Sequence, residues 1–202
     1  MLIYDDTFVA AMTATTQEAT ALGARAYGSE HLLLGLLRAD DHLTQQVVRA
    51  CPGLTVPAVR DAVRGAVDDA PHLARLGLAA DDPAVTAPAA GQGGRLRVKH
   101  TPELQSASNQ ASVKWAHLRR AHALPKERTA SSAVLWLAVL EPSARAPRLL
   151  EAMGIDPDGV RAAVLSALVP AGAGVVTWPT EAPVGPVMRL VHALFERTNI
   201  AR

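Results

Sequence analysis

A short leucine-rich segment, residues 29–38, constrains the fold of this chain more than any other stretch. It holds five leucines within ten residues, and these cover more than one face of a helix, so we expect the helix to be buried on several sides. Ser29 is predicted to cap it, because a serine hydroxyl accepts hydrogen bonds from the free N–H groups of a first turn. Glu30 follows, where a negative charge suits the positive end of the helix dipole.

A second segment, residues 131–141, repeats this pattern 103 residues further along the chain. It keeps the serine before the apolar run, but it carries Ala133 and Val134 where the first segment has Glu30 and His31. Two such segments at this separation indicate that the chain contains an internal repeat.

The similarity extends beyond the two leucine-rich segments. Residues 47–63 match residues 149–164, with one residue fewer in the turn of the second stretch. The separation of matched residues grows from 96 to 103, because the second copy has a longer loop around residues 125–127. We therefore expect one compact domain made of two pseudo-symmetric halves.

Apolar spacing and capping residues predict an all-α fold with four helices in each half. The helices of the first half are expected at residues 5–22, at 29–38, from the caps Asp40 and Asp41 to a break at 52–53, and from Thr55 to Val67. Those of the second half are expected from Thr101 to about His122, from a cap at Ser132, with Pro147 in a first turn, and from Asp156 to about Leu168.

Two stretches rich in proline and glycine divide the chain. Residues 71–99 are predicted to be a flexible linker between a first repeat at 1–70 and a second at 100–169, and residues 170–186 a second linker. One extra C-terminal helix is predicted at residues 187–199. Its apolar stripe has helical spacing and consists of Val187, Leu190, Val191, Leu194 and Phe195. We expect this stripe to be buried on this domain or on a partner.

Composition excludes several classes of protein. The 202 residues carry a net charge of +1 with 49% hydrophobic residues, which is unlike a disordered chain and lacks the basic stripe of nucleic-acid binding. No apolar window approaches the roughly 20 residues that span a bilayer, so we expect neither a nucleic-acid nor a membrane partner. The single cysteine and the absence of a visible secretory signal lead us to expect a cytoplasmic protein.

Residues 29–37, which read Ser-Glu-His-Leu-Leu-Leu-Gly-Leu-Leu, resemble the Clp N-terminal repeat, as do Glu18-Ala19 and Leu22-Gly23 before them. In that family the repeat occurs in tandem ahead of the ATPase modules of ClpA- and ClpC-type unfoldases. The resemblance covers residues 1–69 and 99–169 and is stronger in the first half. It implies an all-α module that binds substrates, adaptors or small ligands without catalysis, here expected to stand alone without ATPase modules.

The resemblance implies a first ligand site at Ser29, Glu30 and His31. In ClpC-type relatives the glutamate at the position of Glu30 takes part in binding phosphorylated arginine. The chemistry fits, since a carboxylate can hold a guanidinium in a fork while helix N–H groups receive the phosphate. Ala133 and Val134 cannot do this in the second half. The alternative is that Glu30 only completes a helix N-terminus, with His31 packed against neighbouring backbone.

A second implied ligand surface lies where the first helices of the two repeats meet. It is aromatic in ClpC-type proteins, where cyclic-peptide antibiotics bind. The matching positions here are Met1, Tyr4 and His100. Since most of the aromatic character is lost at these positions, we expect such peptides to bind differently here or not at all.

The sequence contains no constellation of catalytic residues that we can identify. It lacks a Gly-x-x-x-x-Gly-Lys-Ser/Thr phosphate loop, a Gly-x-Ser-x-Gly elbow and the histidine or cysteine spacing of a zinc site. We therefore expect no enzyme activity, no cofactor and no metal. Cys51 is predicted to be a core residue, because it matches the apolar Met153 in the repeat.

The function expected from these features is non-catalytic recognition. The expected partners are a Clp ATPase, its adaptors or its substrates, or peptide-like small molecules. One version is a regulator or decoy that sequesters molecules otherwise bound by a full-length Clp ATPase. The alternative is a scaffold that docks an unrelated partner through residues 187–199.

Overall fold

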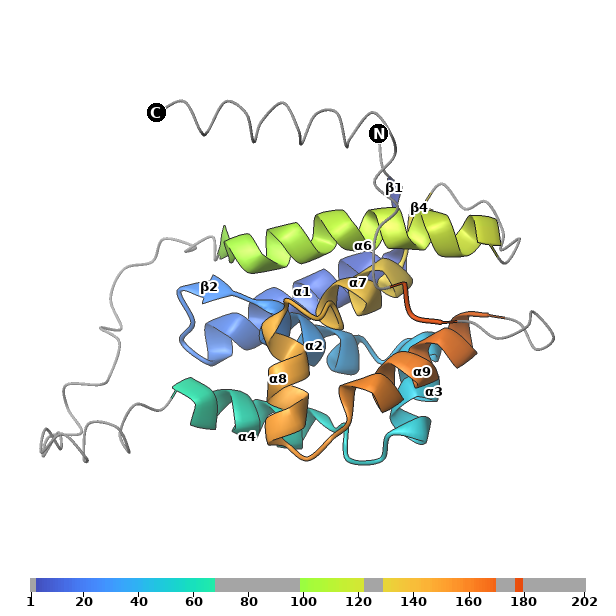
Figure 1. Cartoon of the computed structure of the whole chain (residues 1–202). Helices are drawn as coiled ribbons and strands as arrows, with labels where there is room; N and C mark the ends of the chain where they lie inside the picture. The colour runs from blue at the N-terminus through green and yellow to red at the C-terminus, as the bar shows by residue number, and fades with distance from the viewer. Residues whose placement is uncertain (1–2, 68–98, 122–128, 170–176, 180–202) are drawn as a thin grey trace, which may run out of the picture.

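The computed structural model describes residues 3–67, 99–121, 129–169 and 177–179, and within them the protein is all-α, as predicted (Figure 1). The helices in these ranges are α1 Asp6–Ala21, α2 Ser29–Ala39, α3 His42–Ala50, α4 Val56–Val67, α6 Pro102–Ala121, α7 Ser132–Val139, α8 Arg145–Ala152 and α9 Pro157–Leu168. The strands in the same ranges have two residues each and are β1 Ile3–Tyr4, β2 Ala26–Tyr27, β3 Lys99–His100 and β4 Thr129–Ala130.

Several helices begin where the sequence supplies a capping side chain. At the start of α1, Asp5 Oδ1 accepts a hydrogen bond from the N–H of Phe8 at 2.9 Å. At the start of α3, Asp41 Oδ1 accepts one from the N–H of Thr44 at 2.7 Å. Asp156 caps α9, whose first residue is a proline. These bonds satisfy N–H groups that a first turn leaves free, and the predicted starts of these helices are confirmed.

The two serines predicted to cap the leucine-rich helices do not cap them. Gly28 is the N-cap of α2 and Ser131 that of α7, so Ser29 and Ser132 are the first residues of their helices. The Ser29 hydroxyl bonds instead to the start of α8. The prediction for Asp40 is also wrong: with φ at 47° it ends α2 in the left-handed conformation rather than capping α3.

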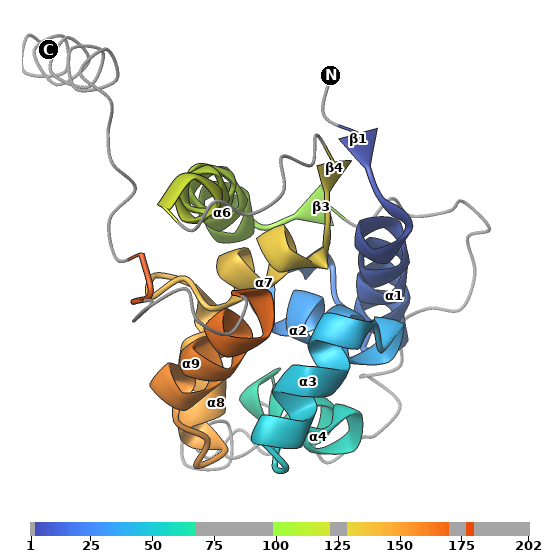
Figure 2. The same cartoon turned by 90° about the vertical axis from the view of Figure 1, so that its right-hand side faces the viewer.

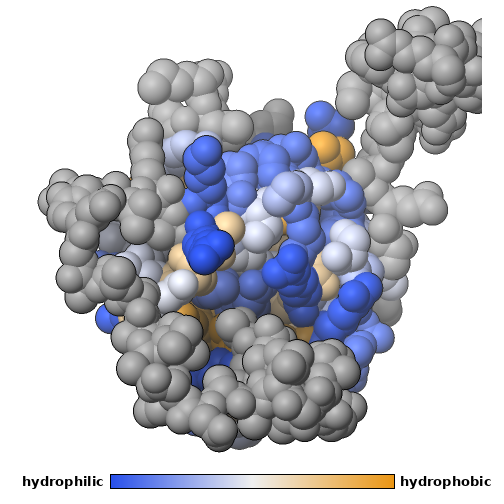
Figure 3. Space-filling view, turned by 90° about the vertical axis from the view of Figure 1, so that its left-hand side faces the viewer, coloured by the Kyte–Doolittle hydropathy of each residue, from blue (hydrophilic) through white to orange (hydrophobic). Residues whose placement is uncertain are grey.

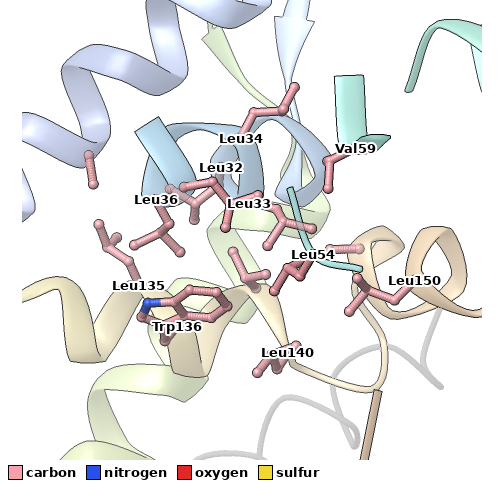
Figure 4. Packing of buried hydrophobic residues seen from close by; sticks show 14 of the residues in the cluster. Leu32, Leu33, Leu34, Leu36, Leu54, Val59, Leu135, Trp136, Leu140 and Leu150 are labelled. Carbon is pink, nitrogen blue, oxygen red and sulfur yellow. The ribbon is translucent and has the colours of Figure 1, made fainter. Parts of the chain in front are cut away.

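Helix α2 lies at the centre of the fold, as its leucine-rich sequence predicts. Its residues from His31 to Leu37 are all buried, and α1, α4, α7 and α8 pack around it. Figure 4 shows its leucines beside Leu135 and Trp136 of α7 and Leu150 of α8. Full burial of one leucine side chain contributes about 1.5–3 kcal/mol, so α2 is a main source of stability for the whole domain.

Two pairs of short parallel strands connect segments that are far apart in the sequence. β1 pairs with β4, with Tyr4 opposite Ala130, and β2 pairs with β3, with Tyr27 opposite His100. Helix α7 packs against both α1 and α6, which lie on either side of it in Figure 2. The strands and α7 thereby fix the position of α6 relative to α1.

Three sequence predictions fall wholly or mainly on residues outside the described ranges. They concern Met1, the linker at residues 71–99, of which only Lys99 is described, and the amphipathic helix at residues 187–199.

The middle of the second predicted linker packs on the folded core. Trp178 contacts the hydrophobic core and Pro179 is buried. The guanidinium carbon of Arg161 on α9 lies 5.9 Å from the centre of the Trp178 ring, within range of a cation–π interaction. The stretch predicted as a linker at residues 170–186 therefore contains a segment that packs on the core.

The coloured residues on the face shown in Figure 3 are mainly hydrophilic. Large hydrophobic side chains that are exposed in the described ranges include Tyr4, Val9 and Val113. Of these, Tyr4 lines a groove. No helix in the described part of the chain is both long and apolar enough to cross a membrane.

Candidate functional site

A groove of about 230 Å³ runs between α1 and α6, over a floor made by α2 and α7; we call it the α1–α6 groove. The floor and the α1 wall are apolar, with Phe8 and Met12 on α1 and Val134 on α7. The α6 wall is mainly polar and uncharged, and consists of Leu104, Gln105, Ser108, Asn109 and Ser112. An apolar space with a few polar groups on one side is typical of sites for small or peptide-like ligands.

Tyr4 of β1 and His100 of β3, two of the residues expected from the family resemblance, both line this groove. The Tyr4 ring stacks on Phe8 with ring centres 4.3 Å apart, yet 52% of the Tyr4 surface is exposed. His100 meets Tyr27 edge-on, with ring centres 6.2 Å apart. Burial raises the pKa of the Tyr27 hydroxyl, which keeps it a neutral phenol. Phe8 and Tyr27 thus supply aromatic rings at this surface, although the family resemblance named only Met1, Tyr4 and His100 there.

Ser29, the first residue of the other predicted site, connects three helices. Its hydroxyl accepts hydrogen bonds from the N–H groups of Arg145 and Ala146 at 2.9 and 3.0 Å. The same hydroxyl donates to Glu103 Oε1 at 3.0 Å. Ala144, the N-cap of α8, makes no side-chain hydrogen bond. Ser29 of α2 therefore caps α8 across the interface, with Glu103 of α6 as a second acceptor for Arg145.

The Glu30 carboxylate folds back over the start of its own helix. Its Oε1 lies 3.2 Å from Nδ1 of His31 and 3.7 Å from a guanidinium nitrogen of Arg145. A Cβ at Gly28 would lie 2.5 Å from Glu30 Oε2, so glycine is needed for this placement. Burial raises the pKa of the Glu30 carboxyl, but hydrogen bonds from His31 and from the Glu30 N–H outweigh burial and lower the pKa overall. Glu30 is therefore ionised at neutral pH.

Nδ1 of His31 lies near two groups that demand opposite roles. The Gly28 N–H, at 3.3 Å, needs an acceptor, whereas Glu30 Oε1, at 3.2 Å, needs a donor, and one nitrogen cannot be both. Nε2 of His31 is buried with no hydrogen-bond partner among the described residues. A proton there would be a buried donor without an acceptor, which is costly. Neither tautomer satisfies every group: a proton on Nδ1 faces Glu30 but takes the acceptor from the buried Gly28 N–H, whereas a proton on Nε2 keeps that bond and is itself without an acceptor among the described residues.

A second space, the Glu30 hollow, has a volume of about 320 Å³ and lies between α4 and α8. Its lining combines Glu30 and apolar side chains such as Leu149 with Arg145 and Arg148. Arg145 is 62% exposed and also pairs with Glu103, with Nε 3.1 Å from Oε2. The Glu30 hollow can thus offer one carboxylate and two guanidinium groups to a ligand.

Two buried ion pairs were missed in the sequence. Glu18, whose side chain is 1% exposed, accepts hydrogen bonds from Arg60 at 2.7 and 3.0 Å and from Arg38 at 2.8 Å. The bonds from Arg60, helped by Arg38, hold the pKa of the Glu18 carboxyl below its usual value although burial opposes them. Lys114 pairs with Glu141, and here both side chains are buried. None of these residues lines the groove or the hollow, so we assign them structural roles.

The sequence did contain a signal for these pairs. Glu18 and Lys114 are 96 residues apart, and Arg38 and Glu141 are 103 apart, which are the separations of the matched segments. The pair is Glu18 with Arg38 in the first copy and Lys114 with Glu141 in the second, so both charges are reversed between the copies. Charges that change together at matched positions indicate a contact in space.

The described residues contain no group of three or more histidine, cysteine, aspartate or glutamate side chains that could hold a metal ion. Cys51 is partly buried against the core. Burial, with Asp156 nearby, raises the pKa of its thiol. Because the thiolate is the nucleophilic form, Cys51 lacks the environment of a catalytic cysteine.

No protein-family model and no curated protein matches the chain. The groove offers apolar and aromatic surface with polar groups on one wall, whereas the hollow offers charge.

Proposed function

We propose that this protein is a non-catalytic recognition module related to the N-terminal domains of Clp unfoldases, which binds peptide-like segments in the α1–α6 groove. Its partners are Clp substrates or adaptors, or a Clp ATPase that it regulates or for which it acts as a decoy. One observation carries the proposal: Tyr4 and His100, which the family resemblance assigns to a ligand surface, line the same apolar groove.

Corresponding contacts support the relationship to tandem repeats. When each residue is replaced by its counterpart in the other half, one contact becomes the other. In the proposed alignment Tyr4 corresponds to His100, and Tyr27 corresponds to Ala130. The strand pair of Tyr4 with Ala130 then corresponds to the pair of His100 with Tyr27. The buried ion pairs exchange in the same way. A pseudo-twofold arrangement of two repeats accounts for both exchanges.

The chemistry of the groove favours a peptide with apolar side chains. The volume of about 230 Å³ is below the roughly 300–1,000 Å³ usual for a drug-sized ligand, so the groove accommodates one or two side chains of a segment that lies along it. Gln105, Ser108 and Asn109 stand on the polar wall, where they can bond to the main chain of such a peptide. This combination suits an unfolded segment rather than a folded surface.

A binding experiment with a blocked groove tests the proposal. The probe is fluorescently labelled, carboxymethylated α-lactalbumin, a permanently unfolded protein, and the readout is anisotropy. Ser108→Arg introduces a long charged side chain into the groove, and Ser106→Arg is the matched control on the exposed face of the same helix. We expect Ser108→Arg to weaken binding at least about tenfold, equivalent to about 1.4 kcal/mol, and Ser106→Arg to leave it unchanged.

The proposal is wrong if the probe does not bind, or if both arginine variants weaken binding equally. The second result would mean that the added positive charge, and not the groove, determines the affinity. Unchanged far-UV circular dichroism and melting temperature confirm that both variants are folded.

A second candidate function, phosphoarginine binding at the Glu30 hollow, is favoured by the charges gathered there. Glu30 can bind the guanidinium of the ligand, while Arg148 and Arg145 are placed to receive its phosphate. The contact of Arg145 with Glu30 is long, at 3.7 Å, and Arg145 is exposed, so a ligand can displace it.

Calorimetric titration with free phosphoarginine tests this second function. A charge-assisted contact contributes about 1.5–3 kcal/mol, so Glu30→Ala should weaken binding by about one to two decades. Glu151→Ala on the exposed side of α8 is the matched control, since it removes an equal charge outside the hollow. No heat of binding in the parent protein would leave Glu30 as a helix-terminus residue.

A further inference from the structure

The α1–α6 groove has the length of the C-terminal apolar stripe. Its α6 wall runs from Leu104 to Ser112, a span of eight residues or about 12 Å at 1.5 Å per residue. The stripe from Val187 to Phe195 also spans eight residues, about 12 Å in a helix. We propose that residues 187–199 of the same chain dock in the α1–α6 groove. This inference rests on the proposed function of the groove.

The last described residues bring the chain close to the groove. Trp178 packs against a small cluster of α6, α7 and α9 residues that includes Val134 and Ala138, and these two also line the groove. Phe8 packs against the same cluster from the groove side. In Figure 2 the red segment at residues 177–179 lies on the side of α6 and α7 that faces away from α1. Anchor and groove are therefore separated by the width of one helix layer.

The intervening chain is long enough to cross that layer. Residues 180–186 are seven residues, which reach about 24 Å when extended at about 3.4 Å each. A path around half of a helix about 10–12 Å in diameter measures about 17 Å. With Trp178 held on the core, the stripe can therefore reach the groove of its own chain, and a second copy is not needed to fill it.

The two surfaces also agree in chemistry. The groove has an apolar floor and an exposed aromatic stack of Tyr4 on Phe8, and the stripe supplies aliphatic side chains and Phe195. Aromatic rings favour further edge or offset contacts with a third ring. A helix laid in such a groove is a common mode of peptide recognition, read through residues at i, i+3, i+4 and i+7. The stripe therefore competes with the peptide ligands proposed above.

Methionine methyl NMR on the full chain tests the contact. Met12 lines the groove, whereas Met153 does not and serves as an internal reference. Leu194→Asp with Phe195→Asp should shift the Met12 signal and leave Met153 unchanged. The matched control is His192→Asp with Ala193→Asp, an adjacent pair on the opposite side of the predicted helix, which should shift neither signal.

A spin label distinguishes the occupant. With Ala193→Cys in a Cys51→Ser chain, the label should broaden Met12 when both are on one chain. It should not broaden Met12 when labelled chains are mixed with isotope-labelled chains that carry no label. Broadening only between chains would assign the groove to a second copy and overturn the proposal, and so would the absence of broadening in either sample.

Binding of carboxymethylated α-lactalbumin separates this inference from the function on which it rests. If the stripe fills the groove in about nine chains of ten, releasing it by Leu194→Asp with Phe195→Asp should tighten binding about tenfold. Equal groove-dependent binding by parent and variant overturns the inference and leaves the proposed function standing. Absence of groove-dependent binding in both overturns the proposed function, while the Met12 signals still decide what occupies the groove.

Discussion

The ammonium group of Lys114 lies 2.5 Å from Oε2 of Glu141, and the two side chains are 0% and 7% exposed. Glu18 and Arg38 form the corresponding contact between α1 and α2, at 2.8 Å, with the charges reversed. A buried charge brought against a like charge would be strongly unfavourable. The reversal therefore favours pairing of α2 with α1 and of α7 with α6 over the exchanged arrangement.

Removing one partner of the Lys114–Glu141 pair should be far more harmful than removing both. Lys114→Met leaves the Glu141 carboxylate buried without its partner, and we expect a loss of about 3–5 kcal/mol in the free energy of unfolding. Lys114→Met with Glu141→Leu should fall within about 1 kcal/mol of the parent or exceed it, because well-packed apolar residues often replace buried pairs at no cost. Urea unfolding of the four proteins of the cycle measures this difference. Additive losses would show that the charges do not interact.

The Glu18 carboxyl should make the protein sensitive to acid. Its pKa in the folded state is lowered, below the value of about 4.3 for an unfolded chain. It therefore stabilises the fold above about pH 4.3, and this contribution is lost as pH falls through the lower pKa of the folded state.

Unfolding of Glu18→Gln should consequently differ most from the parent at neutral pH. We expect a clear deficit at pH 7 that shrinks as the pH falls below about 4.3. Glu151→Gln, a change at an exposed position on α8, is the control and should follow the parent throughout. A deficit that stays constant between pH 7 and pH 3 would contradict the assignment of Glu18 as the responsible carboxylate.

The capping role of Ser29 predicts a loss of stability that a surface serine does not share. Ser29→Ala leaves the N–H groups of Arg145 and Ala146 with fewer acceptors, and loss of a cap costs about 0.5–2 kcal/mol. Ser166→Ala on the exposed side of α9 should be neutral or slightly stabilising, since alanine is the better helix former. Hydrogen exchange should accelerate at the start of α8 in the first variant, and equal behaviour of the two variants would refute the cap.

Local features of the fold could be predicted from the sequence because they depend on neighbours in the chain. Asp5, Asp41 and Asp156 cap the helices that follow them directly. The leucine density of α2 was enough to predict burial on several sides. Such features need only helical periodicity and a side chain three residues away.

The remaining features depend on contacts between distant segments. Ser29 is of a residue type that often caps the helix beside it, but its hydroxyl caps α8, more than a hundred residues later. Trp178 lies in a stretch whose prolines and glycines predict a linker, yet its ring finds the core. Of the candidate site, Tyr4 and His100 were named in advance, whereas Tyr27 and Phe8 were missed because their approach to the groove is set by tertiary packing.

The contact between α1 and α2 is close enough to require glycine at position 35. A Cβ on Gly35 would lie 2.0 Å from Thr15 Oγ1 and 2.6 Å from the carbonyl oxygen of Ala11. Thr15 Oγ1 also donates to the Ala11 carbonyl at 2.7 Å, so the side chain cannot turn away without breaking a buried hydrogen bond. The clash must therefore be relieved by moving one helix from the other.

Gly35→Ala should accordingly lower the free energy of unfolding by about 1–3 kcal/mol or more, the usual cost of overpacking a core. Gly65→Ala in α4 is the matched control, because nothing lies within 4 Å of a Cβ there. In a helix interior this second change should raise stability by about 0.5–1 kcal/mol. The midpoints of urea unfolding, compared between variants with the same m-value, measure both changes in stability. Stabilisation by both alanines would mean that helix propensity outweighs packing at Gly35, and the contact between α1 and α2 would then have to be looser than the structure shows.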